Sequence, residues 1–419
     1  MRIGIDCRMY RREIAGIGTY LRNLIFHLAE IDQENEYVLF MTPQDAEEFQ
    51  VDSGQWTVDR SKFNIQHSKF KIVIVDIHHY SLKEQTKFGR IVESENLDLI
   101  HYPNFNHPLL CKTPFVATIH DLIYLHFPGR AMNSPLHRFL YRRLNKHIAK
   151  RAKKIIAVSE HTRQDFLENF PCDLEKVEVV YEAALFDRDP TSPTSLRNKL
   201  DDNAFDTHRG RISTPRSRTS LNSTLDTQSA LSLSKGHSTL PIFLYVGAWR
   251  PHKNLVFLIE AFDQVVQEIP KAKLVIVGKV DPAFPEISAK VKELKLEQNV
   301  LFTDFVAEQK ELERLYQMAT AFVFPSLYEG FGLPPLEAAA RGVPVICSNR
   351  TSLPEVMGEA ALFVDPENRE AWSEAMLRIV RDEKLRSVLI KKGLVQVEKY
   401  SWKKAAKQTL EIYQKAFLQ

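Results

Sequence analysis

Two carboxylates flank a glycine loop in the second half of the chain. Glu329 and Glu337 are separated by seven residues in the run Ser-Leu-Tyr-Glu-Gly-Phe-Gly-Leu-Pro-Pro-Leu-Glu-Ala (326–338). The two prolines suit the first turn of a helix, where a missing N–H group costs nothing, and Gly342 suits its end. The pattern therefore places Glu329 before the loop and predicts that Glu337 lies in the first turn of the helix.

The start of this helix predicts a site for an anion. Free N–H groups of the loop and of the first turn would face one ligand, and the helix dipole favours phosphate there. A loop that holds a phosphorylated ligand between two carboxylates suggests a sugar-nucleotide site. The alternative is a helix start with ordinary acidic capping.

A second segment carries cations that suit the same ligand. Residues 246–254 are predicted to form a strand end, a turn and a helix start, with Asn254 as a plausible N-cap. Arg250 and Lys253 stand just before it, and two cations at such a turn suit a diphosphate. Basic side chains that are only solvated at a loop tip are the alternative. The pairing with the glycine loop favours the diphosphate interpretation.

The sequence offers no convincing metal site. The four cysteines are scattered without metal-ligand spacing, and unpaired thiols suit a reducing cytoplasm. Asp187 and Asp189 form an Asp-x-Asp pattern where the chain leaves its first half, and we interpret this pattern as accidental. His120 and Asp121 resemble a metal dyad, but no further cluster supports it. We therefore expect a metal-independent protein without a cofactor.

Short apolar runs alternate with helices in both halves, which is typical of parallel sheets buried on both faces. Residues 16–18 are predicted as a loop, and residues 254–268 as an amphipathic helix. The predicted strands are residues 3–6, 37–41, 71–75, 97–101, 115–119 and 154–158, then 242–246, 273–277, 300–303, 321–324 and 343–347. Each half is therefore expected to be a doubly wound α/β unit that binds ligands beyond the carboxyl ends of its strands.

Length and composition predict a globular protein of two domains. The chain has 419 residues, and one core rarely exceeds ~250–300 residues. A charged content of 26% and a net charge of +3 give no argument for nucleic acid as a partner. Asp6 prevents a signal-peptide core, and no apolar run approaches the ~18–20 residues of a membrane span. We therefore expect a cytoplasmic protein, or one that touches a membrane only from the side.

The middle of the chain, residues 201–239, differs in character from both halves. It is crowded with Ser, Thr and Arg and lacks hydrophobic periodicity. We interpret residues 202–238 as a disordered insertion that carries no chemistry. A regulatory phosphorylation segment is the alternative.

Residues 138–154 form a strongly basic segment. It carries eight Lys or Arg residues, and no Asp or Glu occurs between Ala131 and Ser159. One hypothesis is that its basic face meets anionic lipid, or the phosphate of a lipid-linked acceptor, in an electrostatic contact that salt weakens. The alternative is a solvated surface helix. In both cases the apolar face at helical spacing, which the core would need, consists of Leu140, Leu144, Ile148 and Ile155.

The two site segments together resemble the retaining glycosyltransferases of family 4, which have the GT-B fold. The similarity rests on Glu-x7-Glu within residues 328–338 and on Val-Gly-x5-Lys-Asn in residues 246–254. The Glu-x7-Glu segment is highly specific, whereas the N-terminal glycine loop alone is a weak signal. The likeness covers nearly the whole chain outside the insertion, and its further motifs are residues 15–20, 118–121, 158–162 and 400–402.

The resemblance implies two Rossmann-like domains that face a central cleft. Residues 1–186 would form the acceptor-side N-terminal domain, and the C-terminal helix of residues 403–419 would cross back to join it. Residues 187–240 would form a linker that holds the insertion. Residues 241–402 would form the domain that binds the nucleotide-sugar.

The functional residues of the family map onto defined positions of this chain. The implied catalytic residues are His120, which would reach the transferred sugar, Glu329, which would face it, and Lys253, which would stabilise the leaving diphosphate. Glu337 would accept hydrogen bonds from the ribose hydroxyls, without any metal. The implied donor-binding residues are Gly16, Gly18, Arg250, Lys253, Asn254, Phe305, Val306, Ser326, Glu329, Gly330, Phe331, Gly332, Leu333 and Glu337.

One departure from the family pattern bears on the donor. Many relatives carry an Arg directly after the glycine equivalent to Gly247, and this chain has Ala248 there. Arg250 would supply the second cation, as in a mannosyltransferase-like subgroup. This version of the loop favours GDP-mannose as donor, with UDP-glucose next. The implied acceptor is a glycan or a lipid-linked molecule in surface polysaccharide synthesis.

Several other functions share part of this pattern. A UDP-sugar glycosyltransferase would use the same site, and a GT-B sugar-nucleotide epimerase would need no acceptor. A phosphorylase would need a pyridoxal-phosphate lysine and a longer chain. A catalytically silent binder would not need the full set of matched polar residues. A dinucleotide oxidoreductase fits worst, because residues 16–18 lack the third glycine of its fingerprint.

Overall fold

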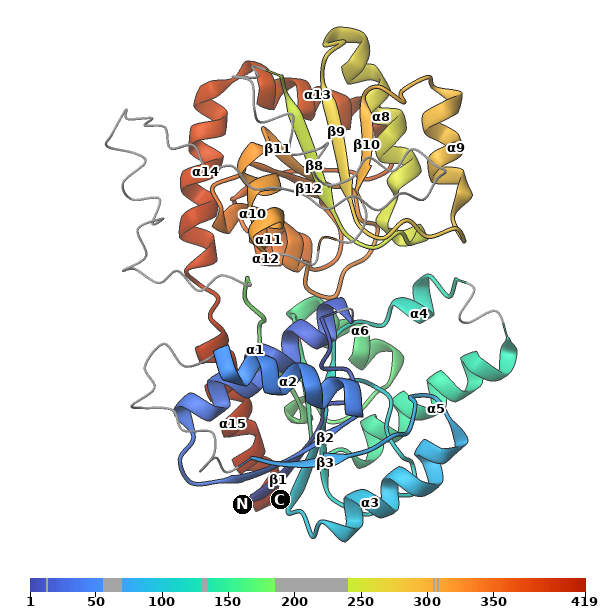
Figure 1. The fold of residues 1–419 in the computed structure, drawn as a ribbon, viewed down its shortest axis with the longest axis vertical. Helices are drawn as coiled ribbons and strands as arrows, with labels where there is room; N and C mark the ends of the chain where they lie inside the picture. The colour runs from blue at the N-terminus through green and yellow to red at the C-terminus, as the bar shows by residue number, and fades with distance from the viewer. Residues whose placement is uncertain (13, 56–69, 130–133, 185–239, 304–305, 307–308) are drawn as a thin grey trace, which may run out of the picture.

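Each half of the chain folds around one parallel β-sheet (Figure 1). The computed structural model describes residues 1–12, 14–55, 70–129, 134–184, 240–303, 306 and 309–419. The predicted insertion of residues 202–238, the Asp187–Asp189 pattern and Phe305 lie outside these described residues.

The strand orders show that both sheets are doubly wound. The N-terminal sheet has the order β3-β2-β1-β4-β5-β6-β7, and the C-terminal sheet has the order β10-β9-β8-β11-β12-β13. Neighbouring strands pair in parallel throughout. In each sheet the chain starts in the middle, runs to one edge, and returns to build the other side. The predicted α/β class with two doubly wound units is confirmed.

The elements have the following bounds. The N-terminal strands are β1 (Arg2–Asp6), β2 (Glu36–Met41), β3 (Phe70–Ile74), β4 (Leu99–Tyr102), β5 (Phe115–Ile119), β6 (Lys154–Ala157) and β7 (Val177–Val179). The C-terminal strands are β8 (Ile242–Val246), β9 (Lys273–Val277), β10 (Val300–Thr303), β11 (Ala321–Phe324), β12 (Val345–Ser348) and β13 (Ala361–Val364).

The helices alternate with these strands. In the first half they are α1 (Ala15–Ile31), α2 (Pro43–Gln55), the π-helix η2 (Glu84–Phe88), α3 (Gly89–Ser94), α4 (Ile123–His126), α5 (Pro135–Arg151), α6 (Glu160–Asn169) and the 3₁₀ turn η4 (Leu174–Lys176). In the second half they are the 3₁₀ turn η7 (Pro251–Lys253), α8 (Leu255–Glu268), α9 (Pro285–Glu293), α10 (Gln309–Met318), α11 (Leu333–Ala340), α12 (Leu353–Met357), α13 (Arg369–Arg381), α14 (Glu383–Val397) and α15 (Trp402–Leu418). None of these described helices has both the length and the apolar content needed to cross a bilayer.

Successive residues of the N-terminal strands pack on opposite faces of their sheet. In β2, Tyr37, Leu39 and Met41 belong to one apolar cluster, whereas Val38 and Phe40 belong to another. Side chains alternate between the two faces of any strand. Because helices cover both faces here, every position of β2 from Tyr37 to Met41 is buried and the strand reads as a continuous apolar run.

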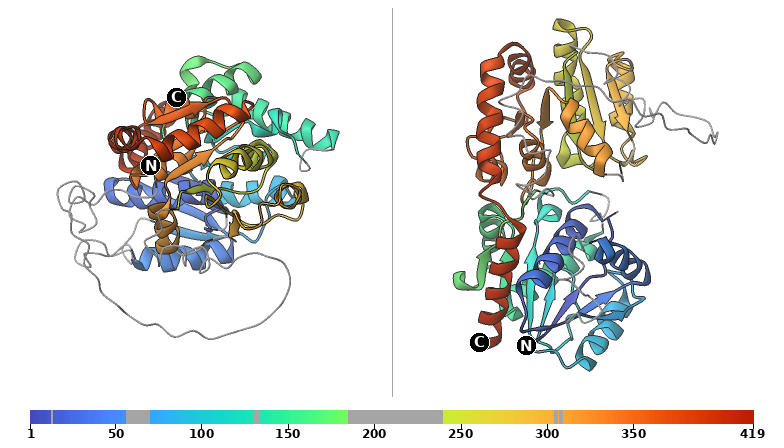
Figure 2. Two further views of the ribbon diagram at one scale, coloured as in Figure 1. Left: turned by 90° about the horizontal axis from the view of Figure 1, so that it is seen from above. Right: turned by 60° about the vertical axis from the view of Figure 1, so that its left-hand side comes forward.

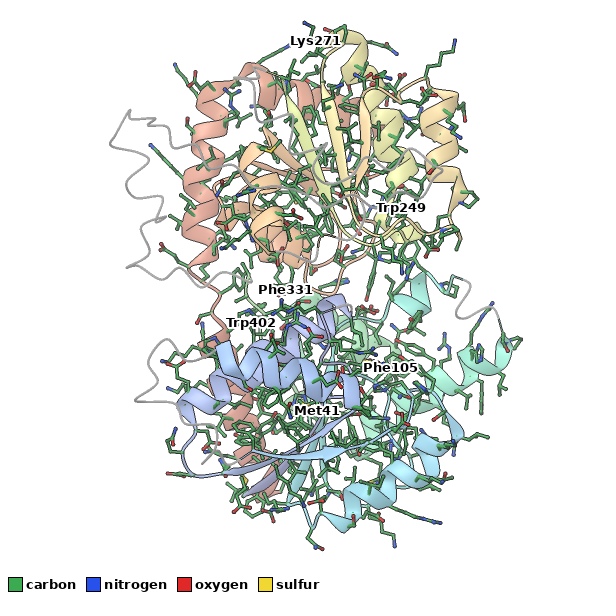
Figure 3. The ribbon with its side chains drawn as sticks, in the orientation of Figure 1. Met41, Phe105, Trp249, Lys271, Phe331 and Trp402 are labelled. Atoms are coloured by element: carbon green, nitrogen blue, oxygen red, sulfur yellow. The ribbon has the colours of Figure 1, made fainter. Side chains whose placement is uncertain are left out.

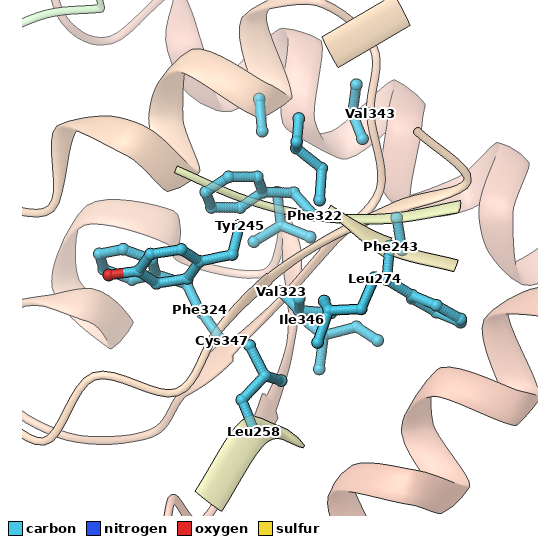
Figure 4. Close-up of a cluster of buried hydrophobic side chains, with 14 of the residues drawn as sticks. Phe243, Tyr245, Leu258, Leu274, Phe322, Val323, Phe324, Val343, Ile346 and Cys347 are labelled. Atoms are coloured by element: carbon cyan, nitrogen blue, oxygen red, sulfur yellow. The ribbon is translucent and has the colours of Figure 1, made fainter. Parts of the chain in front are cut away.

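The core of the C-terminal domain joins side chains of its central strands (Figure 4). Tyr245 of β8 stacks on Phe324 of β11, with 5.7 Å between the ring centroids. Helix α8 buries Leu258 and Phe262 against this core, as its spacing predicts. Helix α13 packs on α8 from outside the sheet.

The chain crosses back between α14 and α15, and α15 lies along the N-terminal domain, so that the two ends of the chain lie together (Figures 1 and 2). It packs along α1. At its start Trp402 is buried and meets Tyr20 edge to face, with 6.0 Å between the rings. Near its end the Tyr413 hydroxyl shares a hydrogen bond of 2.7 Å with Nδ1 of buried His101 in β4. The helix is therefore part of the core of the N-terminal domain.

Some local predictions were wrong. Gly16 and Gly18 lie in the first turn of α1 and not in a loop. Ile155 lies in β6 and not on the face of a helix, since α5 ends at Arg151. Leu140 is 43% exposed and does not pack on the core. The edge strands β7 and β13 were not predicted.

Candidate active site

The structure brings the two predicted site segments together. The Nζ atom of Lys253, at the end of η7, lies 2.5 Å from Oε1 of Glu329, and both side chains are largely buried. The backbones are joined as well, because the N–H group of Leu327 donates to the carbonyl of His252 at 2.7 Å. The Ser326 hydroxyl donates to the same carbonyl at 3.1 Å. The turn after β8 and the loop after β11 therefore act as one unit.

Lys253 supplies the positive charge that contacts the glycine loop. Burial, together with the charges of Lys253 and Arg250, lowers the pKa of His252 to about 2. His252 is therefore neutral at physiological pH. Arg250 points elsewhere: its Nη1 atom pairs with Oδ2 of Asp281 at 2.8 Å. Of the two predicted cations, only Lys253 contacts the glycine loop.

Asn254 and Ser326 have roles that differ from the predicted ones. Asn254 occupies the N-cap position of α8 with a left-handed backbone (φ 60°), but its side chain makes no capping bond. It donates instead to the carbonyl of Pro366 at 2.8 Å. Ser326 is fully buried, and its hydroxyl donates to backbone carbonyls. These two side chains fix the loops in place.

The glycine loop presents N–H groups without a protein partner. In the described part of the chain, the amides of Gly330, Phe331, Gly332 and Leu333 donate to no protein acceptor. Gly332 has a φ of 97°, a left-handed conformation that favours glycine. A Cβ atom there would also lie 2.6 Å from Cδ2 of Leu353. The loop therefore needs this glycine to hold its open N–H groups at the start of α11.

Two hydroxyls that were not predicted form hydrogen bonds with the backbone of this loop. Thr351 Oγ1 accepts a hydrogen bond from the N–H group of Glu329 at 3.0 Å. The Ser352 hydroxyl donates to the carbonyls of Glu329 and Phe331 at 3.0 and 2.9 Å. Phe331 is itself buried and lies edge to face with Tyr400, near the junction of the domains (Figure 3). No local pattern in residues 351–352 predicts this support.

Glu337 lies one turn further along α11 than predicted. The helix begins at Leu333, so Glu337 is in its second turn. Its carboxylate is 5% exposed and accepts a hydrogen bond from the Tyr316 hydroxyl at 3.2 Å. Burial raises the pKa of Glu337, and the charge of Arg341 and the Tyr316 bond oppose this rise. A buried carboxylate with few donors is well suited to accept hydrogen bonds from a ligand.

His120 follows β5 and faces the glycine loop from the N-terminal domain. Its Nδ1 atom lies 3.0 Å from Oε1 of Glu182, and its Nε2 atom lies 3.0 Å from the carbonyl oxygen of Pro103. Glu182 was not predicted. A sugar hydroxyl would therefore reach the ring of His120 only by replacing one of these contacts. Next to it, burial raises the pKa of Asp121, which also feels the charges of Glu329 and Lys253.

The carbonyl of Gly330 joins the two domains. It accepts hydrogen bonds from the hydroxyls of Ser159 and Thr162, at 2.5 and 3.0 Å. A Cβ atom at position 330 would lie 1.7 Å from the carbonyl oxygen of His120. No side chain fits at that distance, so Gly330 is required for the contact between the loop and the end of β5.

Tyr328 and Glu355 extend this contact. The Tyr328 hydroxyl donates to Asp165 Oδ2 at 2.5 Å and accepts from the N–H group of Leu122 at 3.1 Å. The Glu355 carboxylate accepts from the first two N–H groups of α6, at 2.7 and 3.0 Å. A carboxylate at a helix N-terminus is favoured by the helix dipole. Side chains of the C-terminal domain thus form hydrogen bonds with the start and with one face of α6.

The remaining predicted residues divide as follows. Gly16 faces open space, since no atom lies within 4 Å of its Cβ position. Gly18 packs on the backbone just before α1, with only 2.4 Å between its Cβ position and the carbonyl oxygen of Arg11. Val306 is partly buried against the C-terminal core. Phe305 lies outside the described residues.

Two cavities lie away from the predicted site residues. A cavity of about 700 Å³ lies between α13 and the start of α14, and one of about 760 Å³ is lined by the end of α5. Neither is lined by Lys253, Glu329 or Glu337. Among the described residues, no three His, Cys, Asp or Glu side chains are grouped so that they could hold a metal ion.

Chemically, the site combines one cation, two buried carboxylates and a row of open N–H groups. The cation and the N–H groups suit the phosphates of a ligand, and they would stabilise negative charge that develops there. The carboxylates suit its hydroxyls. Such a set can hold a phosphorylated sugar and assist the departure of its phosphate.

Comparisons with known proteins identify both halves. Residues 14–183 match the family model described as Glycosyltransferase Family 4, and residues 233–396 match the one described as Glycosyl transferases group 1. The O-antigen chain mannosyltransferase B of Escherichia coli is 29% identical over 75% of this chain and 74% of its own. The O-antigen chain mannosyltransferase RfbU of Salmonella typhimurium is 27% identical over 71% and 68%.

Solved structures share the fold along the whole chain. A sucrose-phosphate synthase of Thermosynechococcus elongatus has a TM-score of 0.70 at 20% identity and covers 100% of this chain and 99% of its own. HepE of Anabaena, in complex with UDP-glucose, has a TM-score of 0.69 at 15% identity and covers 99% of both chains. With matched family models in both halves, the chain is a glycosyltransferase that belongs to family 4 and has the GT-B fold.

Proposed function

We propose that this protein is a retaining glycosyltransferase that moves mannose from GDP-mannose to a glycan or lipid-linked acceptor in surface polysaccharide synthesis. The observation that carries the proposal is the contact of Lys253 with Glu329 beside a row of N–H groups that have no protein partner. The choice of mannose is supported by the relatives from Escherichia coli and Salmonella typhimurium, whose names describe O-antigen chain mannosyltransferases.

In the proposed complex the donor lies along the glycine loop. The N–H groups of residues 330–333 hold the sugar and the distal phosphate, and Glu337 accepts hydrogen bonds from the ribose. Lys253 then turns from Glu329 to the diphosphate, which gains negative charge as the glycosidic bond breaks. Glu329 is left to face the hydroxyls of the transferred sugar. Lys253 and the start of α11 supply this stabilisation, so we propose that no metal or other cofactor is needed.

Arg250 and His120 need small movements to take part. Arg250 is half exposed and would leave Asp281 to reach the diphosphate. Exposed ion pairs are weak, so this exchange costs little. His120 would exchange the carbonyl of Pro103 for a sugar hydroxyl. Gly16 faces open space and gives the diphosphate room at the start of α1.

A UDP-sugar is the second candidate donor, because HepE, which shares the fold, was solved with UDP-glucose. A thermal-shift screen with GDP-mannose, UDP-glucose, UDP-N-acetylglucosamine and UDP-galactose separates the two. A ligand at 100 times its Kd adds about 2.7 kcal/mol to the free energy of unfolding. We expect the largest shift with GDP-mannose. A larger shift with a UDP-sugar would overturn the proposed donor.

Transfer itself is tested with radiolabelled GDP-mannose, with and without membrane lipids that carry acceptors. We expect label to move to lipid or glycan only when the acceptor is present. Conversion of the donor at the same rate without any acceptor would instead indicate an epimerase or a hydrolase.

A further inference from the structure

The start of helix α5 stands clear of the N-terminal domain (Figure 1). All six residues from Pro135 to Leu140 are exposed, although three of them are large and apolar. Leu136, Phe139 and Leu140 are 61%, 60% and 43% exposed. Monomeric proteins seldom expose neighbouring apolar side chains without a partner for them.

These three side chains continue into a row of cations. At 3.6 residues per turn, Leu136, Phe139 and Leu140 share one stripe of α5 with residues further along the helix. The members that follow on this stripe are all exposed, and they are Arg143, Lys146 and Lys150. The opposite side of α5 packs on the core through Tyr141, Leu144, Asn145, Ile148 and Ala149.

The segment that carries this outer stripe contains no acidic residue. No Asp or Glu occurs anywhere from residue 122 to residue 159, which includes all of α4, α5 and β6. Arg142, also exposed, adds to the positive charge beside the stripe. A surface with an apolar end and a cationic body favours an occupant that is apolar inside and anionic at its boundary.

We infer that the outer stripe of α5 docks on an anionic lipid bilayer. Leu136, Phe139 and Leu140 enter the boundary between headgroups and acyl chains, and Arg143, Lys146 and Lys150 lie against the headgroup phosphates. Amphipathic helices bind at this depth through apolar side chains, with basic residues that attract anionic lipid. The contact is therefore partly apolar, and not only electrostatic as the sequence suggested.

A second copy of the chain fits this stripe poorly. Two copies that met through it would place Arg143, Lys146 and Lys150 of both chains together, with no acidic residue on α5 itself to offset them. Like charges brought face to face at an interface are strongly unfavourable. The charge of the stripe thus favours lipid over self-association.

The position of the stripe connects it with the candidate active site. The chain leaves β5 at His120, forms α4, and then reaches α5. Phe127 follows α4, and its ring centroid lies 6.1 Å from that of His252, the neighbour of Lys253. A bilayer at the start of α5 would therefore adjoin the side of the site that faces the N-terminal domain. This use of the surface, to receive a lipid-linked acceptor, rests on the proposed function, whereas the lipid contact itself does not.

Co-sedimentation of the full chain with vesicles tests the docking. The vesicles contain phosphatidylcholine alone, or phosphatidylcholine mixed with phosphatidylglycerol, each at low and at high salt. We expect pelleting only with the mixed vesicles, and we expect part of it to survive high salt. The double variant Leu136→Ser, Phe139→Ser should lower the vesicle partition coefficient about tenfold or more at both salt concentrations.

A second variant separates the cationic contribution. Arg143→Gln with Lys146→Gln should lower partitioning about tenfold at low salt and should remove most of its salt dependence. Val395→Ser, at a position of α14 that is 62% exposed, is the matched control and should bind as the parent does. Melting temperatures of all variants should stay unchanged, because every substituted side chain is exposed.

Three outcomes would overturn the inference. They are equal pelleting with both lipids, no pelleting with either, and unchanged pelleting of the Leu136→Ser, Phe139→Ser variant. A dimer in sedimentation velocity that this variant abolishes would assign the stripe to a second copy instead. Loss of the thermal shift with GDP-mannose, by contrast, would count against the proposed donor and leave the vesicle result standing.

Discussion

At the scale of single residues, the site depends on pairs of groups that compensate one another before a ligand arrives. Lys253 and Glu329 are both largely buried and satisfy each other's charge. A buried ion pair costs desolvation, and removing one partner leaves an uncompensated charge. A diphosphate that takes Lys253 from Glu329 replaces one anion by another. This exchange keeps the lysine in place for the moment when negative charge develops.

The first prediction concerns Lys253. Lys253→Ala should reduce kcat about 10²–10³-fold, because it removes a donor that stabilises developing charge, an effect of ~2.7–4 kcal/mol. Lys271→Ala is the matched control, since Lys271 is exposed at the far end of the C-terminal domain (Figure 3). Steady-state kinetics with the donor identified in the screen measure both. Normal turnover in Lys253→Ala would remove this residue from the mechanism.

The second prediction concerns the pH dependence of stability through Glu337. Burial raises its pKa in the folded protein above the value of the unfolded chain. Its contribution to stability is therefore fully present below the unfolded pKa of ~4.5 and is lost as the pH rises through the folded pKa. Glu337→Gln does not titrate. Melting temperatures are measured without donor from about pH 4 to about pH 8. Over this range the melting temperature of Glu337→Gln relative to the parent should thus increase as the pH rises.

The same substitution should weaken the binding of the nucleotide-sugar donor. A neutral amide accepts weaker hydrogen bonds than a carboxylate, so the donor KM should rise with little change in kcat. Exposed Glu374→Gln on α13 is the control for both measurements. A pH-independent difference in melting temperature would contradict the stability argument, and an unchanged KM would contradict the ribose contact.

At the scale of elements, sequence and structure agree where burial alone decides the fold. Strands β8, β9, β10 and β11 have the bounds that the apolar runs predicted, because both faces of these strands are covered. Agreement fails where a contact outside the element itself decides. The glycines of α1 were interpreted as a loop, but Gly18 allows α1 to pack on the carbonyl of Arg11.

The candidate site divides in the same way. Lys253, Glu329 and Glu337 could be identified because each has a local signal, a cation or a carboxylate beside a glycine loop or a helix start. Thr351, Glu182 and Glu355 could not, because each acts on a segment far away in the sequence. A hydroxyl or carboxylate in an ordinary loop or short helix carries no sign of the distant partner that gives it a function.

The third prediction concerns the attachment of α15. His101 is buried, and burial lowers its pKa to about 3, so the ring is neutral and bonds to Tyr413 and Thr118. Tyr413→Phe leaves Nδ1 of His101 without its partner, which should lower the free energy of unfolding by about 1–3 kcal/mol. Urea unfolding measures this. Phe417→Ala, on the same helix and 50% exposed, should change it far less; equal effects would show that the hydrogen bond contributes nothing.

At the scale of the whole molecule, the two domains meet through polar contacts that converge on α6. Glu355 of α12 accepts from its first two N–H groups, and Tyr328 reaches Asp165 on its face. The glycine loop, which carries the open N–H groups of the site, is tied to the same helix through Gly330. Interfaces between domains of one chain are commonly polar and allow relative motion. These contacts therefore determine how the site is completed from both sides.

The fourth prediction tests this arrangement. Glu355→Ala should expose the N–H groups of Glu160 and His161, so hydrogen exchange at the start of α6 should accelerate while exchange in the two sheets stays unchanged. The donor KM should rise, since the C-terminal domain, which carries the glycine loop, loses one of its contacts with the N-terminal domain. Glu359→Ala is the matched control, because Glu359 lies four residues away, is 85% exposed, and pairs with Lys392 at the surface. If α6 exchanged at the same rate in both variants, Glu355 would not hold the domains together, and the positioning of the loop would have to rest on Tyr328 and Gly330.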